Sequence, residues 1–284
     1  MIKIGVFYQQ IEAAVKEKGL TIEKAMDELR EHGVTYVDVD SNYLLKEKPE
    51  VFSERLKEHG IHIISVHSDS CCDVNSEETL CESIEEMKKR MMLAKRAESK
   101  FFMIVPDKAQ SFCEEQSEKF ALGVRRMLKE LAAYGKEIGM QATIENYSVR
   151  DFPYTSFDSI DWILRNIPDI SYTYDSGNYL LAGFNELVGA KTFFDKTVYA
   201  HLKEVKPVEY ETPLLKDGVY YYKVPFGEGI VNNFGVVDYY LENGYDGVFT
   251  VEMYNTDNTY AKTLLSVDRL QERILQQKPV KKGK

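Results

Sequence analysis

Four helical patterns in this chain end in a glycine that is followed at once by a short apolar run. The junctions read REHG-VTYVDV, KEHG-IHIISV, KEIG-MQATIE and LENG-YDGVFTVE, and their glycines are Gly33, Gly60, Gly139 and Gly244. Glycine is favoured just after a helix because it adopts the left-handed backbone conformation without a Cβ clash. The recurrence predicts an α/β chain assembled from equivalent helix–strand units.

Apolar runs and helical patterns alternate along almost the whole chain. The strands that we expect span residues 2–8, 35–40, 61–68, 101–106, 141–147, 170–175, 198–204 and 247–254. The expected helices span residues 21–33, 49–60, 76–99, 114–138, 157–167, 185–196, 232–243 and 258–277, and Trp162 in one of them is expected to join the core. This alternation predicts a single-domain (β/α)8 TIM barrel over residues 1–277. The competing fold is an open doubly wound sheet, and no G-x-G-x-x-G motif follows the first strand to support its dinucleotide-binding form.

Residues 205–229 interrupt the alternation. They contain alternating apolar residues around a Lys-Asp-Gly turn, which predicts a β-hairpin insertion after the seventh strand. The hairpin either covers the mouth of the barrel or contacts a neighbouring subunit, or else it is a surface decoration. Tyr220, Tyr221 and Tyr222 suit a subunit interface, because tyrosine is enriched in interfaces. Residues 278–284 (KPVKKGK) are expected to form a disordered basic tail.

Composition excludes several classes of function. The formal net charge is −10, which opposes binding to nucleic acid, and no apolar run approaches membrane-spanning length. The 4 cysteines are crowded together without paired C-x-x-C spacing, so we expect neither a disulfide framework nor structural zinc. The first residues lack a signal-peptide layout. We therefore expect a cytoplasmic protein that acts on a small molecule, as a possible homodimer or homotetramer.

Four of the expected strands carry residues that can bind a metal at or near their ends. They are Glu145, Asp175, His201 and Glu252. Each alone suits a structural role at a barrel rim, but the carboxyl ends of parallel barrel strands all open onto one face. Together they predict a metal site of mixed nitrogen and oxygen ligands. Such a set favours Mn²⁺, with Mg²⁺, Co²⁺ or Zn²⁺ as alternatives.

A metal held by these groups would bind the neighbouring oxygens of a hydroxy-ketone and acidify the adjacent C–H bond. Glu145 and Glu252 are then the candidate pair of catalytic acid/base carboxylates. A proton that leaves one face and returns on the other gives an epimerisation. A proton that moves between neighbouring carbons through an enediol gives an aldose–ketose isomerisation.

The motifs around these residues resemble the xylose isomerase-like TIM barrels, a family of sugar and sugar-phosphate isomerases and epimerases. The resemblance spans most of the chain and is strongest in ATIENY, YTYDSGN, AHLKE, PFGEG and GYDGVFTVEMY. It implies the TIM barrel fold and a sugar or sugar phosphate as substrate. It also implies that Glu145, Asp175, His201 and Glu252 bind the metal and that Glu145 and Glu252 transfer protons.

The chain departs from some members of this family. Ketose 3-epimerases carry a His where this chain has Asn178 and an Arg where it has Pro207, and Lys203 or Lys206 could replace the charge of that Arg. Apurinic endonucleases of the same fold use a His-rich trinuclear zinc site. This chain has 5 His, and only His67 and His201 fall at ligand positions.

His67 and Lys203 are the candidate substrate-binding residues. His67 ends the third strand, where it could hydrogen-bond a substrate oxygen or be satisfied by the backbone. Lys203 lies two residues after His201 on the same side of its strand, where it could meet a carbonyl or phosphate or form a rim salt bridge. Glu204 points to the other face and is expected to be structural. Phe7 and Tyr8 could form a hydrophobic wall of the pocket, but aromatic residues at barrel ends more often pack, so neither is a candidate site residue.

Two other functions are compatible with the same residues. A metal-dependent dehydratase of a polyol such as an inosose would use the same C–H acidification, followed by loss of a hydroxyl. A barrel that binds a sugar without turnover is the second alternative.

Overall fold

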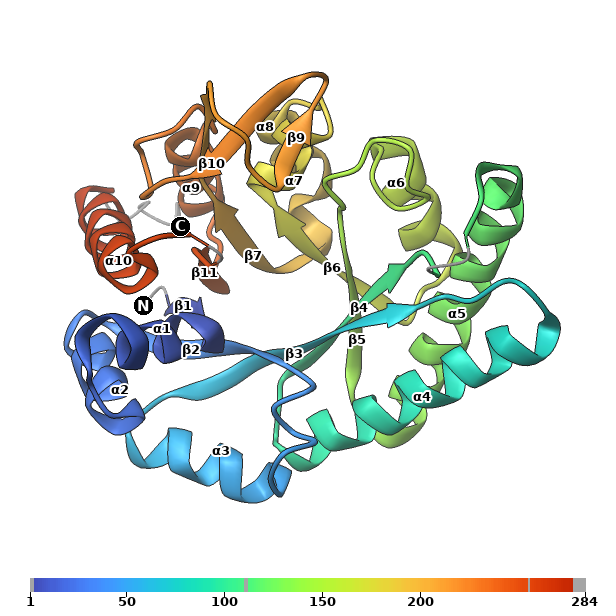
Figure 1. Ribbon diagram of the computed structural model, residues 1–284, viewed down its shortest axis with the longest axis horizontal. Helices are drawn as coiled ribbons and strands as arrows, with labels where there is room; N and C mark the ends of the chain where they lie inside the picture. The colour runs from blue at the N-terminus through green and yellow to red at the C-terminus, as the bar shows by residue number, and fades with distance from the viewer. Residues whose placement is uncertain (1–2, 110–111, 255, 278–284) are drawn as a thin grey trace, which may run out of the picture.

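The computed structural model describes residues 3–109, 112–254 and 256–277 and forms a closed barrel of parallel strands (Figure 1). The barrel order is β1-β11-β7-β6-β5-β4-β3-β2. Its strands are β1 (Lys3–Phe7), β2 (Val34–Asp40), β3 (His62–Cys71), β4 (Phe101–Asp107), β5 (Gln141–Glu145), β6 (Ile170–Asp175), β7 (Thr197–Lys203) and β11 (Val248–Glu252). The predicted (β/α)8 barrel is confirmed.

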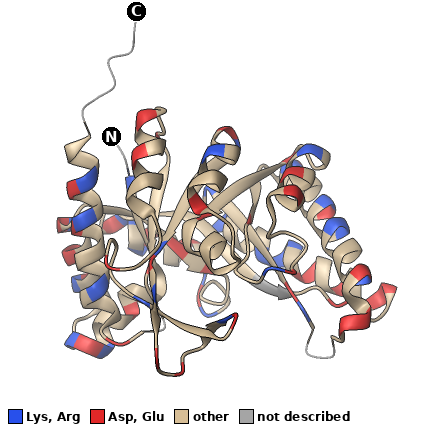
Figure 2. Cartoon of the chain, turned by 90° about the horizontal axis from the view of Figure 1, so that it is seen from above, with Lys and Arg blue, Asp and Glu red and all other residues tan. Residues whose placement is uncertain are grey.

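The helices lie around the outside of the barrel (Figure 1). They are α1 (Tyr8–Lys18), α2 (Ile22–Glu31), α3 (Pro49–Glu58), α4 (Glu77–Arg96), α5 (Ser117–Ile138), α6 (Phe157–Asn166), α7 (Ser176–Leu181), α8 (Glu186–Phe193), α9 (Asn233–Glu242) and α10 (Thr259–Gln276). Figure 2 shows acidic and basic positions interspersed along these helices. None of the described helices has the length and apolar character needed to cross a bilayer.

The predicted glycine junctions are present at all four positions. Gly33, Gly60, Gly139 and Gly244 have φ values of 88°, 70°, 69° and 81°. This left-handed conformation ends each helix and turns the chain toward the next strand.

Helix α1 was not expected. The Phe7 N–H donates to Gln10 Oε1 over 2.7 Å and caps the helix, and Gln10 Nε2 donates to Thr263 Oγ1 of α10 over 2.7 Å. Tyr8 therefore begins a helix instead of ending the first strand, and its ring packs 4.7 Å from that of Tyr43. The cap depends on a side chain whose direction the apolar pattern does not reveal.

Trp162 does not join the core as expected. Helix α6 turns Ile160, Ile163 and Leu164 inward, so that Trp162 lies on the opposite face and is 38% exposed. The guanidinium of Arg125 covers its ring at 4.2 Å from the centroid.

The barrel interior is apolar at its amino-terminal end and polar toward the carboxyl ends of the strands. A cluster of Ile64, Phe101, Met103, Val105, Tyr199 and Val248 fills the interior. The rings of Phe101 and Tyr199 stack with centroids 5.4 Å apart. This packing closes the barrel beneath the strand ends, so a ligand can approach them only from the carboxyl-terminal face.

The insertion forms a three-stranded antiparallel sheet of order β8-β10-β9, made of β8 (Val205–Val208), β9 (Leu214–Lys216) and β10 (Val219–Lys223). The predicted hairpin is β9–β10, with Asp217 and Gly218 at positive φ in its turn. Strand β8 adds the third strand by pairing with β10. The last pair, Lys223 with Val205, places the end of β10 beside the end of β7.

Gly244, which follows α9, allows a test of whether the helix–strand junction requires a glycine. Gly244→Ala should lower the free energy of unfolding by about 1 kcal/mol, because the added Cβ disfavours a left-handed backbone. Apart from the two chain neighbours, no atom of the described residues lies within 4 Å of that Cβ, so the expected cost is backbone strain. Urea denaturation would measure the change. The control Glu242→Ala, at an exposed position of the same helix, should stay within about 0.5 kcal/mol of wild type. Equal stability of both variants would contradict the assignment.

Candidate metal centre

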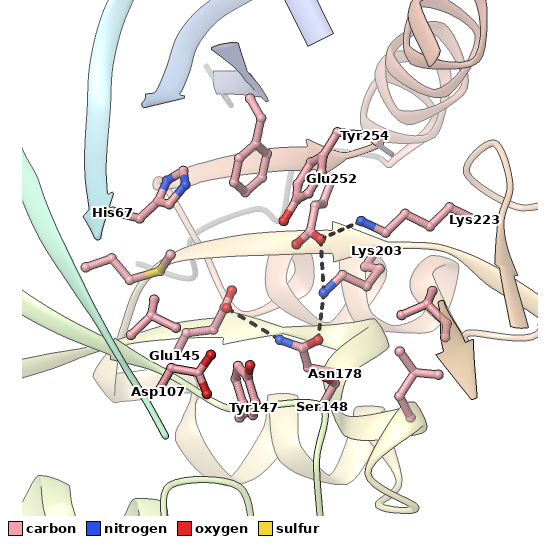
Figure 3. A pocket seen from close by; sticks show the side chains of 15 residues that line it. His67, Asp107, Glu145, Tyr147, Ser148, Asn178, Lys203, Lys223, Glu252 and Tyr254 are labelled. Carbon is pink, nitrogen blue, oxygen red and sulfur yellow. Dashed lines mark hydrogen bonds and ion pairs between the residues drawn. The ribbon is translucent and has the colours of Figure 1, made fainter. Parts of the chain in front are cut away.

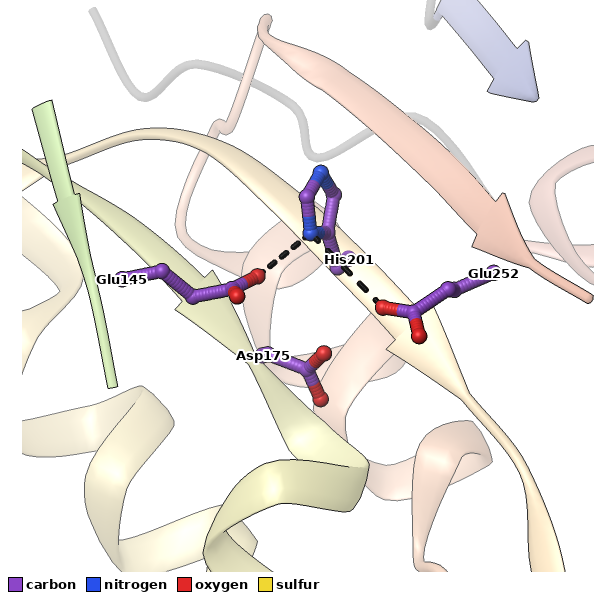
Figure 4. Close-up of side chains that lie close together, drawn as sticks. All are labelled: Glu145, Asp175, His201 and Glu252. Carbon is purple, nitrogen blue, oxygen red and sulfur yellow. Dashed lines mark hydrogen bonds and ion pairs between the residues drawn. The ribbon is translucent and has the colours of Figure 1, made fainter. Parts of the chain in front are cut away.

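The four residues predicted to bind a metal come together at the mouth of the barrel (Figure 4). Glu145, Asp175, His201 and Glu252 are all buried, and each offers a ligand atom within 4.8 Å of the others. Glu145, Asp175 and Glu252 are the last residues of β5, β6 and β11, and His201 lies near the end of β7. The parallel register pairs Asp175 directly with His201.

His201 turns its Nδ1 toward the carboxylates. Nδ1 lies 2.5 Å from Glu145 Oε1 and 4.0 Å from Glu252 Oε2 (Figure 4). Burial lowers the pKa of His201, but the carboxylates of Glu145 and Asp38 outweigh it and raise the pKa well above its usual value. Without a metal, the imidazole is therefore held as the cation of a buried ion pair. A divalent ion would replace that proton on Nδ1.

Asp38 lies behind the imidazole. Its Oδ2 is 3.5 Å from His201 Nε2 and accepts a hydrogen bond from Thr250 Oγ1 over 3.0 Å, while its Oδ1 accepts one from Tyr199 over 3.3 Å. A carboxylate at this place favours the tautomer with its proton on Nε2, which leaves the lone pair of Nδ1 free for a metal.

Asp175 is held by the turn that follows it. Its Oδ1 accepts the Asn178 N–H over 2.8 Å, and Asn146 Oδ1 accepts the Asp175 N–H over 2.9 Å. Asp175 Oδ2 is buried and accepts no hydrogen bond from the described residues, although Lys203 Nζ lies 3.1 Å away. Burial raises the pKa of Asp175 to about 7, against the opposing effect of Lys203.

Lys203 reaches into the cluster, where its ammonium meets three acceptors. Nζ lies 2.6 Å from Asn178 Oδ1, 3.1 Å from Asp175 Oδ2 and 3.0 Å from Glu252 Oε1. The sequence was compatible with two roles for Lys203, a contact with substrate or a salt bridge at the barrel rim. The salt bridge is present. Lys203 also lines the pocket above the cluster, and its role in substrate binding stays a prediction.

A cavity of about 270 Å³ opens above the cluster (Figure 3). Asp107, Glu145 and Tyr147 lie on one side of it, and Lys203 and Lys223 lie with Glu252 on the other. The pocket thus has an acidic wall and a basic wall. A polar ligand would be oriented between them.

His67 and Phe7 line the same cavity. The ring of Phe7 lies 4.9 Å from that of His201 and 5.6 Å from that of His67. His67 Nδ1 is buried and has no hydrogen-bond partner among the described residues, so it could serve a ligand. Phe7 therefore forms part of the pocket wall, which is one of the two roles that its position in the sequence allowed.

Several pocket or site residues were not predicted from the sequence, namely Asp38, Asp107, Lys223 and Tyr254. Asp38 carried a signal that could have been used, since it is an acidic residue inside the apolar run TYVDVD. Lys223 carried none, because it comes from the insertion. Burial lowers the pKa of Lys223, while Glu252 at 3.0 Å opposes that shift.

Glu204 is structural, as expected. It accepts hydrogen bonds from the N–H groups of Gly227 and Val231 and thereby holds the loop after the insertion. Lys206 is exposed on β8 opposite Tyr222 and is absent from the pocket lining, so it does not replace the Arg charge there.

The family model for xylose isomerase-like TIM barrels matches residues 26–272. The chain belongs to this family. The resemblance found in the sequence is therefore confirmed at the level of the family.

Solved structures share the fold of this family member. The IOLI protein with a zinc atom has a TM-score of 0.72 and 17% identity, with 96% of each chain covered. The 3-keto-D-glucoside 4-epimerase YcjR from E. coli has a TM-score of 0.73 and 13% identity over 96% of this chain and 100% of that one. The probable 3-DHS dehydratase AsbF from Bacillus anthracis has a TM-score of 0.71 and 14% identity, covering 95% and 99%. No curated protein matches the chain.

The donor set fits a divalent ion. Three buried carboxylates and one imidazole converge, and Asp175 Oδ2 accepts no hydrogen bond from the described residues. Buried carboxylates are costly unless they are paired or bind a metal. Lys203 contacts Asp175 and Glu252, and Glu145 is paired only through the imidazole that would itself be a ligand. A family member with this cluster could hold a metal ion at the mouth of its barrel.

The position of Asp38 can be tested through metal affinity. Asp38→Asn should weaken binding of Mn²⁺ by roughly tenfold to hundredfold, because an amide supports the required tautomer of His201 less well. Competition with a chromophoric chelator would measure the dissociation constant. Asp107→Asn removes a carboxylate from the same pocket without contacting His201 and should change affinity less. Wild-type affinity in Asp38→Asn would contradict this role.

The raised pKa of Asp175 predicts how the stability of the metal-free protein depends on pH. The fold favours the protonated carboxyl, so this stabilisation is complete below about pH 3.8 and is lost as pH rises through about 7. Asp175→Asn mimics the protonated form. In chelator, the variant should match wild type near pH 4 and become the more stable of the two near pH 8. Thermal unfolding would measure this, and a difference independent of pH would contradict it.

Proposed function

We propose that the protein is a divalent-metal-dependent isomerase or epimerase of a small sugar or sugar phosphate. The observation that carries the proposal is the convergence of Glu145, Asp175, His201 and Glu252 at the mouth of a family barrel. The two glutamates approach the cluster from opposite sides (Figure 4). A substrate carbon held between them could lose a proton to one and regain it from the other.

In this proposal, all four residues hold the metal. Mn²⁺ suits a site of three carboxylates and one imidazole, and Mg²⁺, Co²⁺ or Zn²⁺ could replace it. The bound ion would polarise the substrate carbonyl and acidify the neighbouring C–H bond. His67 and Lys203 would contact substrate oxygens from the pocket wall.

The two glutamates are not equivalent. Glu252 Oε1 lies 3.0 Å from the ammonium groups of both Lys203 and Lys223. Burial alone would raise the pKa of Glu252, but these two cations outweigh it and hold the pKa well below its usual value. Glu145 has no lysine partner among the described residues: its Oε1 lies 2.5 Å from His201 Nδ1, and its Oε2 accepts a hydrogen bond from the Asn178 amide over 3.4 Å.

The pocket limits the size of the substrate. A cavity of about 270 Å³ is at the small end of ligand pockets, so a single sugar unit suits it better than an oligosaccharide. The apolar interior below and the ring of Phe7 would shield a bound substrate from water on those two sides.

A dehydratase of a polyol such as an inosose is the second candidate. The same removal of a proton beside a carbonyl, followed by loss of a hydroxyl, would produce it. The likeness in fold to a probable dehydratase supports keeping this candidate. Product mass distinguishes the two, because dehydration loses one water and isomerisation loses none.

Exchange of substrate hydrogen with solvent tests the acid/base pair. In heavy water, the Mn²⁺-loaded protein should exchange one C–H beside the carbonyl of its substrate, and NMR of a panel of keto sugars would detect it. Glu145→Gln and Glu252→Gln should each slow exchange at least about a hundredfold. Glu228→Gln, which alters a carboxylate paired with Arg269 away from the cluster, should exchange normally. Undiminished exchange in both of the first two variants would refute the pair.

A further inference from the structure

The insertion delivers a buried cation to the pocket. Lys223 is the last residue of β10, is only 8% exposed and lines the cavity above the cluster. Its pairing with Val205 fixes its place beside the end of β7. Figure 3 shows its side chain directed toward Glu252. A lysine at this depth does not serve solubility, so its ammonium must be matched by groups inside the pocket.

Lys223 has hydrogen-bonding capacity to spare. An ammonium has three N–H donors. Three oxygen partners surround the ammonium of Lys203, which donates a hydrogen bond to Asn178 and forms ion pairs with Asp175 and Glu252. Lys223 has one such acceptor, Glu252 Oε1 at 3.0 Å, and the face of the Tyr254 ring with its centroid at 3.8 Å. No further acceptor for Lys223 occurs among the residues that the structure describes, so a donor remains for a ligand.

The charges around Glu252 also favour an added anion. Two ammonium groups share one of its carboxylate oxygens, and a metal on the cluster would draw on the same carboxylate. Glu252 would then be the common partner of three cations. The acidic residues of the opposite wall, Asp107 and Glu145, do not contact Lys223. An anionic group of a ligand beside Lys223 would offset the positive charge of the two lysines on the basic wall.

We propose that Lys223 binds a carboxylate or phosphate group of the substrate, so that the substrate is an anionic sugar derivative and not a neutral sugar. The sugar part of this inference rests on the proposed function. The anionic group would lie against the basic wall, and the hydroxyl groups would face Asp107 across the pocket. In this proposal the insertion determines which substrates bind, while residues at the ends of the barrel strands bind the metal and transfer the proton.

Calorimetry on the full-length, Mn²⁺-loaded protein tests this inference. The probes are D-fructose, D-fructose 6-phosphate, 5-keto-D-gluconate and inorganic phosphate. We expect wild type to bind inorganic phosphate and at least one of the two anionic sugars, the latter about tenfold or more tightly than D-fructose. Binding of the phosphate ester or of the keto acid distinguishes the two kinds of anion.

The variants identify the residue responsible. Lys223→Gln should lose the preference for the anionic sugar and weaken phosphate binding about tenfold or more, whereas Lys223→Arg should keep the preference. Lys206→Gln, which removes an exposed lysine from the same insertion sheet, should behave as wild type. Circular dichroism would show that each variant is folded.

The inference would be overturned if wild type bound neither phosphate nor either anionic sugar, or if anion binding were unchanged in Lys223→Gln. An equal loss of neutral and anionic sugars in Lys223→Gln would also overturn it, because Lys223 would then serve only Glu252. Failure of the proposed function looks different, since C–H exchange would be absent while phosphate binding still depended on Lys223.

Discussion

The structure depends on the burial of three carboxylates around one imidazole at the open end of the barrel. Glu145, Asp175 and Glu252 are taken out of water together with His201, and like charges at this distance repel strongly in a protein interior. Lys203 offsets part of that repulsion by contacting Asp175 and Glu252. His201 pairs with Glu145 and Lys223 pairs with Glu252, which offsets more of it. A divalent ion would reduce the repulsion further, so the charges that set the stability of this region would also set its chemistry.

Parallel strand geometry makes such a cluster possible. Each strand contributes one residue at its carboxyl end, and the register of neighbouring strands fixes the level at which that residue lies. Asn146 locks two of these strands together, because its amide accepts the Asp175 N–H and donates to the Asp175 carbonyl. The cluster is thus held by backbone pairing, which is more rigid than loops and suits a site that must keep its ligands apart without a metal.

Sequence alone predicted the barrel and its metal-binding candidates because both follow periodic rules. Glycines at helix ends marked four of the helix–strand junctions, and strand ends of a parallel barrel share a face wherever they fall in the chain. Lys223 could not be predicted in the same way. Its place depends on how a three-stranded insertion packs over the mouth of the barrel, and the sequence pattern indicated only a hairpin.

Asp38 was missed because one acidic residue inside an apolar run can face the barrel interior or its surface. The prediction that Trp162 is buried in the core was wrong, because an aromatic residue in an amphipathic helix can be covered by a neighbouring side chain, here Arg125, instead of by the core.

The most direct test of the account is the position of a bound ion. Crystals of the protein soaked in Mn²⁺ would be measured near the manganese absorption edge. The account predicts one strong anomalous peak between Glu145, Asp175, Glu252 and Nδ1 of His201. A peak elsewhere alone, or no peak at saturating Mn²⁺, would contradict it.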